Sequence, residues 1–313
     1  MNQDLYIKIA FWYYTLHMTQ DEIAKRLGFT RQRVNQIINS LVDQGIVSIH
    51  VHGYEGENVE TESQLEQLFS LNQVIIASDY GDPAVALYKV ANVAAQYLDK
   101  TIQQGDIIGV SWGQTLAEVI KNMEYQKKGN CRVVQLLGAQ NIDYNAVKSD
   151  EIVRAMADKL DCPSCRFYAP VVVSYAETKH MLLQEKTIQQ SFEWISRCNI
   201  GVLGIGELTE SSTMCKIGYY SPADIKKLRA DGFRADIAMN PVRLDGTTDH
   251  CFMEDRLINP SMDTIRHMKN AIGIACGTDK TEAILAVLRS GCLNTLIIDE
   301  TTAKAVLKRA RAK

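Results

Sequence analysis

Three stretches in the C-terminal part of the chain each follow an apolar run and combine glycine with residues that could bind an anion. In the first, residues 105–115, a strand pattern gives way to serine, glycine and threonine before a helical pattern begins. Backbone amides at the start of a helix, together with the hydroxyls of Ser111 and Thr115, would form a cradle that suits phosphate. A simple strand–helix turn capped by serine or threonine explains the same spacing equally well.

The second stretch, residues 133–140, is another strand pattern that ends in glycine, and the third is residues 275–280. In the third, Lys280 stands at the start of a helical pattern, where a positive charge opposes the helix dipole. An anion beside Lys280 would remove this conflict. Because ligands of open parallel sheets bind beyond the carboxyl ends of the strands, we expect Lys280 and the loop of residues 111–115 to converge on one phosphate.

A helical pattern near the N-terminus carries polar side chains of the kind that read DNA. Its inward positions 34, 37, 38 and 41 are apolar, and its outward face holds arginines and amides without an acidic residue. Arginine reads guanine with two hydrogen bonds, and asparagine or glutamine reads adenine. This composition favours DNA binding over the solvated face of an ordinary helix bundle. We assign DNA binding to Thr30, Arg31, Gln32, Arg33, Asn35, Gln36 and Asn39.

The residues around this helix predict a helix-turn-helix. Thr19 and Glu22 have the spacing of a capping box, Gly28 suits a left-handed position at a helix end, and Thr30 can cap the second helix. The aromatic residues 11–14 could stack on bases, but we expect them to form the small core of the first helix. The alternating residues 45–51 predict a short strand or a rudimentary wing.

The glycine-containing strand ends need a sheet to position them. Apolar runs of strand length alternate with helical patterns beyond residue 70, which predicts a parallel α/β sheet covered by helices on both faces. The predicted strands are residues 74–78, 107–110, 133–137, 200–205, 271–275 and 295–299, and the predicted helices include 84–99, 116–123, 223–228, 281–289 and 302–309.

The segment between these two parts, residues 54–70, contains five glutamates and no basic residue. Its apolar positions have helical spacing, so we predict an acidic connecting helix that stays away from a phosphate backbone. The expected organisation is therefore a DNA-binding domain at 1–53, a linker helix at 54–70, and an effector-binding and oligomerisation domain at 71–313.

Composition limits the classes of function. The 313 residues carry 34 Lys and Arg against 37 Asp and Glu, a net charge of −3, so any DNA contact must come from a local patch. No signal-peptide pattern or membrane-length apolar run is evident, and the eight cysteines are typical of reduced thiols; we expect a cytoplasmic protein with no membrane partner. Cys162 and Cys165 have the spacing of half a zinc or redox site, but a second ligand pair is lacking. We expect no metal and no cofactor.

The order of these motifs resembles the SorC family of bacterial transcriptional regulators. The resemblance rests on Tyr13-Tyr14, the residues 18–24, Leu27-Gly28, Arg31, Val34 and the residues 45–47, followed by Gly-Asp-Ile-Ile-Gly-Val-Ser-Trp-Gly at 105–113. It covers essentially the whole chain. The similarity around residues 105–115 is strongest to the branch of the family that contains the deoxyribonucleoside regulator of Bacillus.

The resemblance implies a Rossmann-like effector domain similar to ribose-phosphate isomerase, glucosamine-phosphate deaminase and CoA-transferase, but without their catalysis. It further implies a homodimer or homotetramer that binds double-stranded operator DNA and is controlled by a phosphorylated sugar or polyol. The residues that it assigns to the effector are Ser111, Trp112, Gly113, Gln114, Thr115, Gly138, Gln140, Asp245, Gly277 and Lys280.

The chain departs from the family pattern at three places. Leu137 stands where the deoxyribonucleoside regulator has the lysine that forms a Schiff base, so the resemblance implies non-covalent binding here. Cys276 replaces a usual glycine, and Asn35-Gln36 stands where many members have Ser-Arg. An isomerase or deaminase is the alternative function, because a lysine and Asp245 could transfer protons; the DNA-reading module would have no role in such an enzyme.

Overall fold

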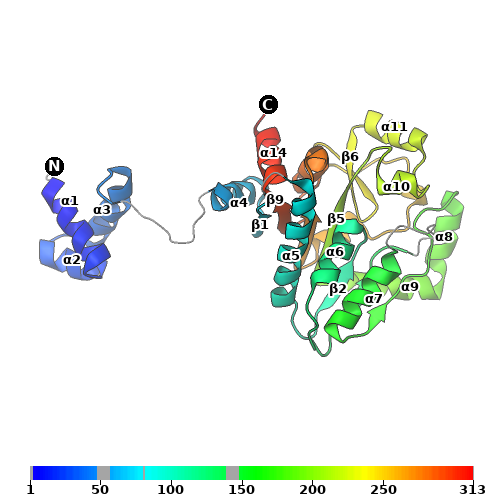
Figure 1. The fold of residues 1–313 in the computed structure, drawn as a ribbon, viewed down its shortest axis with the longest axis horizontal. Helices are drawn as coiled ribbons and strands as arrows, with labels where there is room; N and C mark the ends of the chain where they lie inside the picture. Colours follow the sequence, from blue (N-terminus) through cyan, green and yellow to red (C-terminus); the bar gives the residue numbers. More distant parts are fainter. Residues whose placement is uncertain (1–2, 48–56, 80–81, 139–147, 313) are drawn as a thin grey trace. The chain divides into compact units, whose positions relative to one another are not determined.

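The computed structural model describes residues 3–47, 57–79, 82–138 and 148–312. Its contacts divide the chain into two compact units, residues 1–56 and residues 57–313 (Figure 1). The first has one apolar core and the second has two. The fold class is confirmed: a helix-turn-helix unit is followed by an α/β unit built on a parallel sheet. No helix in the described ranges has both the length and the apolar character that crossing a bilayer requires.

The N-terminal unit is a small helical bundle. Its helices are α1 (Gln3–Ala10), a π-helical turn (Phe11–Thr15), α2 (Gln20–Leu27) and α3 (Arg31–Asp43). The predicted capping box at the start of α2 is confirmed, Gly28 has the predicted left-handed conformation with a φ of 68°, and Thr30 accepts a hydrogen bond from the amide of Arg33. The core residues Ile9, Ile23, Val34 and Leu41 are fully buried.

The aromatic residues 11–14 are only partly in this core. Trp12 and Tyr13 pack against it, whereas Phe11 is 51% exposed and Tyr14 is 38% exposed. The prediction that all four form the core is therefore wrong for Phe11 and Tyr14, because the π-helical turn spreads the four side chains around the helix. The predicted wing lies outside the described residues beyond position 47.

The C-terminal unit is built on a sheet with the strand order β1-β9-β8-β5-β2-β3-β4, in which all neighbours are parallel. Each predicted strand is confirmed to within two residues at either end. The strands are β1 (Gln73–Ala77), β2 (Ile107–Val110), β3 (Arg132–Gln135), β4 (Ser164–Cys165), β5 (Ile200–Glu207), β6 (Phe233–Ile237), β7 (Asn240–Arg243), β8 (Asn270–Ala275) and β9 (Thr295–Asp299).

The sequence patterns missed an antiparallel arm. Strand β5 continues beyond its parallel neighbours and pairs with β6, which pairs with β7. The residues of β6 include a buried aspartate, and β7 contains Pro241, so neither strand has the apolar run that marks the others. This arm matters because it brings Asp236 to the end of β5.

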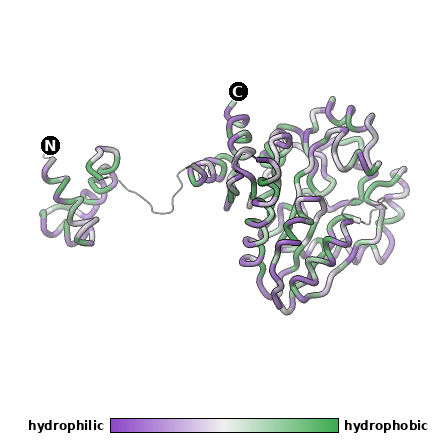
Figure 2. The backbone as a smooth tube through the Cα atoms, in the orientation of Figure 1, coloured by the Kyte–Doolittle hydropathy of each residue, from purple (hydrophilic) through white to green (hydrophobic). Residues whose placement is uncertain are grey.

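Helices cover both faces of the sheet. One core contains apolar residues of α5, α6 and α7, and the other contains those of α9, α11, α13 and α14. The helices carry both apolar and polar residues along their length, as expected when one side packs on a sheet (Figure 2). The helices are α4 (Glu57–Phe69), α5 (Pro83–Thr101), α6 (Gln114–Asn122), α7 (Ser149–Leu160), α8 (Ala176–Gln184), α9 (Lys186–Ser196), α10 (Thr213–Lys216), α11 (Pro222–Ala230), α12 (Met262–Arg266), α13 (Thr281–Arg289) and α14 (Glu300–Arg311), with 3-10 turns at Glu254–Arg256 and Thr278–Lys280.

Helix α4 lies within the acidic segment and belongs to this second unit. Two of its glutamates, one helical turn apart, accept hydrogen bonds from the edge strand β1: Glu66 from the amide of Val74 and Glu62 from the amide of Ile76, both at 2.8 Å. Val74 and Ile76 are alternate residues, so the two carboxylates stand where the carbonyls of a neighbouring strand would be. Helix α4 thereby closes an edge that could otherwise pair with another chain.

Glu62→Ala is expected to destabilise the chain by about 1–3 kcal/mol, because it leaves the covered amide of Ile76 without an acceptor. Burial raises the pKa of Glu62, so Glu62→Gln, which keeps an acceptor oxygen and removes the charge, should be close to neutral. Denaturant unfolding of the full chain measures both changes. An equal loss of stability in the two variants would contradict this role of the carboxylate.

Candidate ligand-binding cavity and DNA-binding surface

The carboxyl ends of β2 and β5 separate and form one side of a cavity. Their pairing ends at Val110 and Val202, and the amide of Ser111 adds one more bond to the carbonyl of Val202. The amide of Gly204 then donates to the hydroxyl of Ser111 at 3.0 Å instead of to a strand carbonyl. Ser111 is 2% exposed. Its side chain therefore holds the two strand ends together where the backbone of β2 turns away.

The loop after β2 leads directly into α6. Gly113 has a φ of 137°, a conformation that side-chain-bearing residues rarely adopt, and it precedes the first residue of α6. No side chain caps the amides at this helix start. The N-terminal end of α6 thus presents unpaired donors and the positive end of its dipole on the side of the cavity, as expected for an anion cradle.

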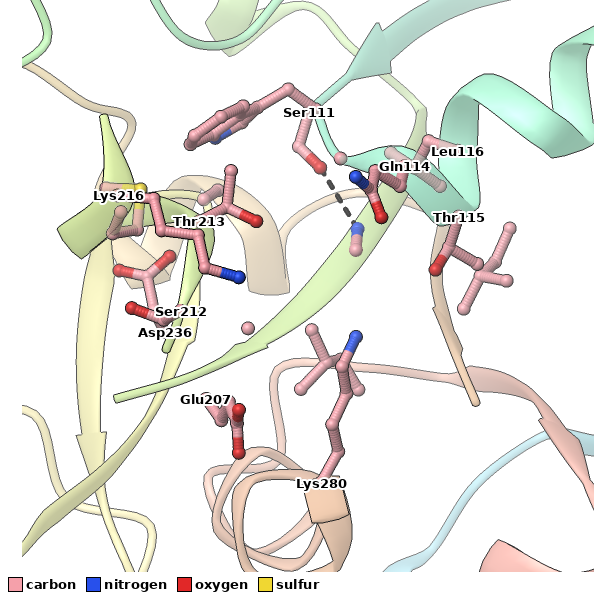
Figure 3. A pocket seen from close by; sticks show the side chains of 18 of the residues that line it. Ser111, Gln114, Thr115, Leu116, Glu207, Ser212, Thr213, Lys216, Asp236 and Lys280 are labelled. Atoms are coloured by element: carbon pink, nitrogen blue, oxygen red, sulfur yellow. Dashed lines mark hydrogen bonds between the residues drawn. The ribbon is translucent and has the colours of Figure 1, made fainter. Parts of the chain in front are cut away.

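Lys280 lies opposite this loop, where it ends the turn Thr278–Lys280 and immediately precedes α13. The thiol of Cys276 lies close to both elements. Burial raises its pKa, whereas the charge of Lys280 and a hydrogen bond with Thr115 lower it. Lys280 and residues 111–115 line the same cavity of about 270 Å³ (Figure 3). The structure therefore brings together the two anion-binding elements that the sequence suggested.

The far side of the cavity carries a buried carboxyl group. Asp236 is 7% exposed, one of its oxygens accepts from the amide of Met239 at 3.2 Å, and the other has no partner among the residues that the structure describes. Burial raises the pKa of Asp236 to about 7. A buried oxygen without a partner is costly, and a ligand hydroxyl would satisfy it.

Further polar side chains complete the wall on this side. Figure 3 shows Lys216 and Lys280 directed toward the space between the β2–α6 loop and Asp236. The end of β5 adds Glu207, which accepts a hydrogen bond from the hydroxyl of Thr209. Ser211, Ser212 and Thr213 also line the cavity. The cavity thus combines the start of α6 and two lysines with a buried carboxyl group and several hydroxyl groups.

Sequence reasoning missed the residues on the hydroxyl-binding side. The apolar strand pattern at 200–205 also ends in glycine and polar residues, namely Gly204, Gly206 and Glu207. The pattern that marked residues 105–115, 133–140 and 275–280 could therefore have identified Glu207. No local signal marks Asp236 or Lys216, because only the antiparallel arm and the short helix α10 bring them here.

Three of the residues predicted to bind the effector do not line the cavity that the described residues form. Asp245 is exposed in a turn and accepts two hydrogen bonds from Thr247, and the aspartate that lines the cavity is Asp236. The amide of Gly277 donates to Asp299, which caps α14. A side chain at Gly138 would meet the carbonyl of Ala169 at 1.9 Å, so close packing explains that glycine. Gln140 lies outside the described residues.

The cysteine and Schiff-base positions also have definite surroundings. Leu137 is 1% exposed and belongs to an apolar core. Burial raises the pKa of Cys165 and raises that of Cys162 to about 11, so both thiols are protonated near neutral pH. In the described ranges, no group of three metal-ligating side chains is present.

The predicted DNA-binding face of α3 is open to solvent. All six polar residues from Arg31 to Asn39 that we assigned are exposed. Three of them contact the turn or α2. The guanidinium of Arg33 lies 4.4 Å from the centre of the Phe29 ring, Arg31 lies 3.7 Å from Asp21, and Asn35 accepts a hydrogen bond from Gln20. Thr30 is exposed as well, and its hydroxyl accepts a hydrogen bond from the amide of Arg33 at the start of the helix.

A helix-turn-helix unit with an amide-rich reading helix, joined to an α/β unit with a polar cavity at its strand ends, defines a ligand-binding transcriptional regulator. Comparison with known proteins agrees. Residues 55–308 match the family described as "Putative sugar-binding domain", and residues 8–66 match the Crp-like helix-turn-helix domain. The chain belongs to this sugar-binding family and is a DNA-binding regulator of the SorC type.

Its relatives share the whole architecture. The chain is 26% identical to the erythritol catabolism regulatory protein of Brucella abortus, over 100% of this chain and 99% of that protein. It is 26% identical to the deoxyribonucleoside regulator of Bacillus subtilis, over 97% of both. The crystal structure of the full-length sorbitol operon regulator of Klebsiella pneumoniae, 24% identical, has the same fold with a TM-score of 0.75 over 98% of this chain and 99% of that one.

In the unfolded chain the carboxyl group of Asp236 loses its proton near pH 4. In the folded chain its pKa is raised to about 7, so it keeps the proton until about pH 7. This group therefore makes the free energy of unfolding fall as pH rises through that window, by up to about 4 kcal/mol. Asp236→Asn, which keeps the acceptor for Met239, should remove this fall. Unfolding of both proteins from pH 4 to pH 8 measures the difference, and parallel curves would show that the carboxyl group is not desolvated.

Proposed function

We propose that this regulator controls a carbohydrate-utilisation operon and that a phosphorylated sugar or polyol is its effector. The observation that carries the proposal is the convergence of Lys280 and the N-terminal end of α6 on one cavity. A phosphate would accept hydrogen bonds from the α6 amides and would be paired with the ammonium of Lys280.

The opposite wall suits the rest of such a molecule. The unpartnered oxygen of Asp236 and the hydroxyls of Ser211, Ser212 and Thr213 offer donors and acceptors to sugar hydroxyls. The volume of about 270 Å³ is at the small end for ligand pockets, which favours a single sugar unit. The names of the relatives, which refer to erythritol, sorbitol and deoxyribonucleosides, support the same class of compound.

Binding is proposed to be non-covalent and without turnover. Leu137 cannot form an imine, and the N-terminal unit gives the bound ligand a role in control of DNA binding that an isomerase or deaminase would not need. The protein is proposed to act in the cytoplasm as a homodimer or homotetramer, since a single helix-turn-helix unit contacts only one half-site of an operator.

Lys280→Ala is expected to weaken effector binding and the response of DNA binding to the effector, because a charge-assisted bond to phosphate is lost. Thermal shift with phosphorylated pentoses, hexoses and polyols measures it, since a ligand at 100 times its Kd adds about 2.7 kcal/mol of stability. The exposed Lys308, outside the cavity, provides a control variant with the same loss of charge, Lys308→Ala. Equal binding of a sugar and its phosphate ester would contradict the phosphate site.

Arg31→Ala is expected to weaken operator binding without loss of folding, since the side chain is exposed. A bidentate contact to a base would make the loss about 1–3 kcal/mol and confine it to one base position, whereas a phosphate contact would lower affinity for all sequences. Gel-shift or anisotropy titrations of the full chain measure this loss. Lys25→Ala, with the same change of charge on α2, is the control, and unchanged operator binding by Arg31→Ala would count against α3 as the reading helix.

A further inference from the structure

The first residue of α2 contacts the reading face of α3. The side-chain amide of Gln20 donates through Nε2 to Oδ1 of Asn35 at 3.1 Å, across fifteen positions of sequence. Gln20 is half-buried, whereas Asn35 is exposed among the predicted DNA-binding residues. Gln20 itself was not among the residues that the sequence assigned to DNA binding.

This contact distinguishes the two ends of the Asn35 side chain. A carboxamide has an acceptor oxygen and a donor nitrogen. The oxygen of Asn35 is held by Gln20, and its Nδ2 makes no hydrogen bond to any residue in the described part of the chain. The donor end is therefore the end that Asn35 offers to a partner outside the protein.

The neighbouring contact of Arg31 is of a different kind. Arg31 and Asp21 form a charged pair at 3.7 Å, and their side chains are 69% and 60% exposed. Salt and a phosphate backbone would compete strongly for this arginine. The hydrogen bond between Gln20 and Asn35 joins two neutral groups, so the negative potential of DNA does not compete for it as it does for the arginine of the ion pair. It can persist when α3 approaches a base pair.

We propose that Gln20 is a specificity-positioning residue, which fixes the Asn35 amide so that its NH₂ group faces the major groove. The proposal rests on the proposed reading role of α3. In the major groove guanine, adenine and thymine each offer an acceptor, but cytosine offers only its amino group. The orientation set by Gln20 therefore selects against cytosine at the base that Asn35 contacts.

Gln20→Glu tests this directly, because a carboxylate accepts hydrogen bonds and does not donate them. The Asn35 amide must then turn, donate Nδ2 to the new carboxylate, and present its oxygen to DNA. An outward oxygen accepts from the amino groups of cytosine and adenine. The helix should tolerate the change, since a negative charge is favourable at the first position of a helix.

The measurement is selection by the full-length protein from a pool of random double-stranded DNA, with sequencing of the bound fraction. Asn35→Ala first identifies the operator position that Asn35 reads, by the loss of preference there. At that position Gln20→Glu should raise the share of cytosine or adenine relative to guanine and thymine by about fivefold or more. Gln20→Ala should relax the preference without reversing it, because the amide can then face either way.

Gln44→Glu is the matched control, since Gln44 is an exposed glutamine at the end of α3 and the change adds the same charge to the same unit. It should leave every base preference unchanged. In the background of Asn35→Ala, Gln20→Glu should have no further effect on preference at this position. The positioning role is overturned if Gln20→Glu lowers affinity for all sequences alike or shifts preference when Asn35 is absent.

The reading role of α3 and the positioning role of Gln20 can be disproved separately. If Arg31→Ala leaves operator binding unchanged and Asn35→Ala changes no base preference, the proposed role of α3 as the reading helix is wrong. If those variants change a preference and Gln20→Glu does not reverse the one at Asn35, only the positioning role of Gln20 is lost. Thermal unfolding of each variant confirms that the unit is folded.

Discussion

The crevice between the carboxyl ends of β2 and β5 is the constraint from which the ligand site follows. In the strand order, the chain runs outward from β2 to β3 and β4 and then returns to place β5 on the other side of β2. The helix after β2 packs in one core, and the residues after β5 pack in the other. The two connections leave in opposite directions, so a crevice must open between them. The hydroxyl of Ser111 fixes its width by bonding to Gly204.

The sides of the cavity differ in chemistry because they come from different parts of the fold. The start of α6 after β2 and Lys280 after β8 both line the cavity, and Lys216 adds a second positive charge on the side of Asp236. The antiparallel arm contributes Asp236, which is desolvated because β6 lies under the helices of that face. A ligand that is negative at one end and rich in hydroxyls along the rest satisfies both walls. This polarity accounts for a sugar-binding domain on a fold shared with many other activities.

Two of the glutamates within residues 54–70 have a structural role that could not be read from the composition of this segment. A run of glutamates before an effector domain suggested a helix that is kept away from DNA by its charge. In the structure Glu62 and Glu66 face the sheet and replace the carbonyls of a missing strand at β1. The same carboxylates therefore protect an exposed edge. The DNA-binding unit is ordered by local interactions, with side-chain caps at the starts of α2 and α3 and two to four buried residues from each helix.

Features set by short-range physics could be predicted from the sequence alone. The capping box at Thr19, the left-handed Gly28, the exposed face of α3 and the six long parallel strands each depend on neighbouring residues or on apolar runs, and all appear as predicted. The position of residues 111–115 at the cavity was predictable for the same reason, because glycine and hydroxyl residues at a strand end mark a helix start. Asp236, Lys216 and the contact between Gln20 and Asn35 were not predictable, since they depend on which distant segments become neighbours. The family resemblance pointed to Asp245, whereas the carboxyl group that lines this cavity is that of Asp236. Only the pairing of β6 with β5 decides which carboxyl group is buried beside the cavity.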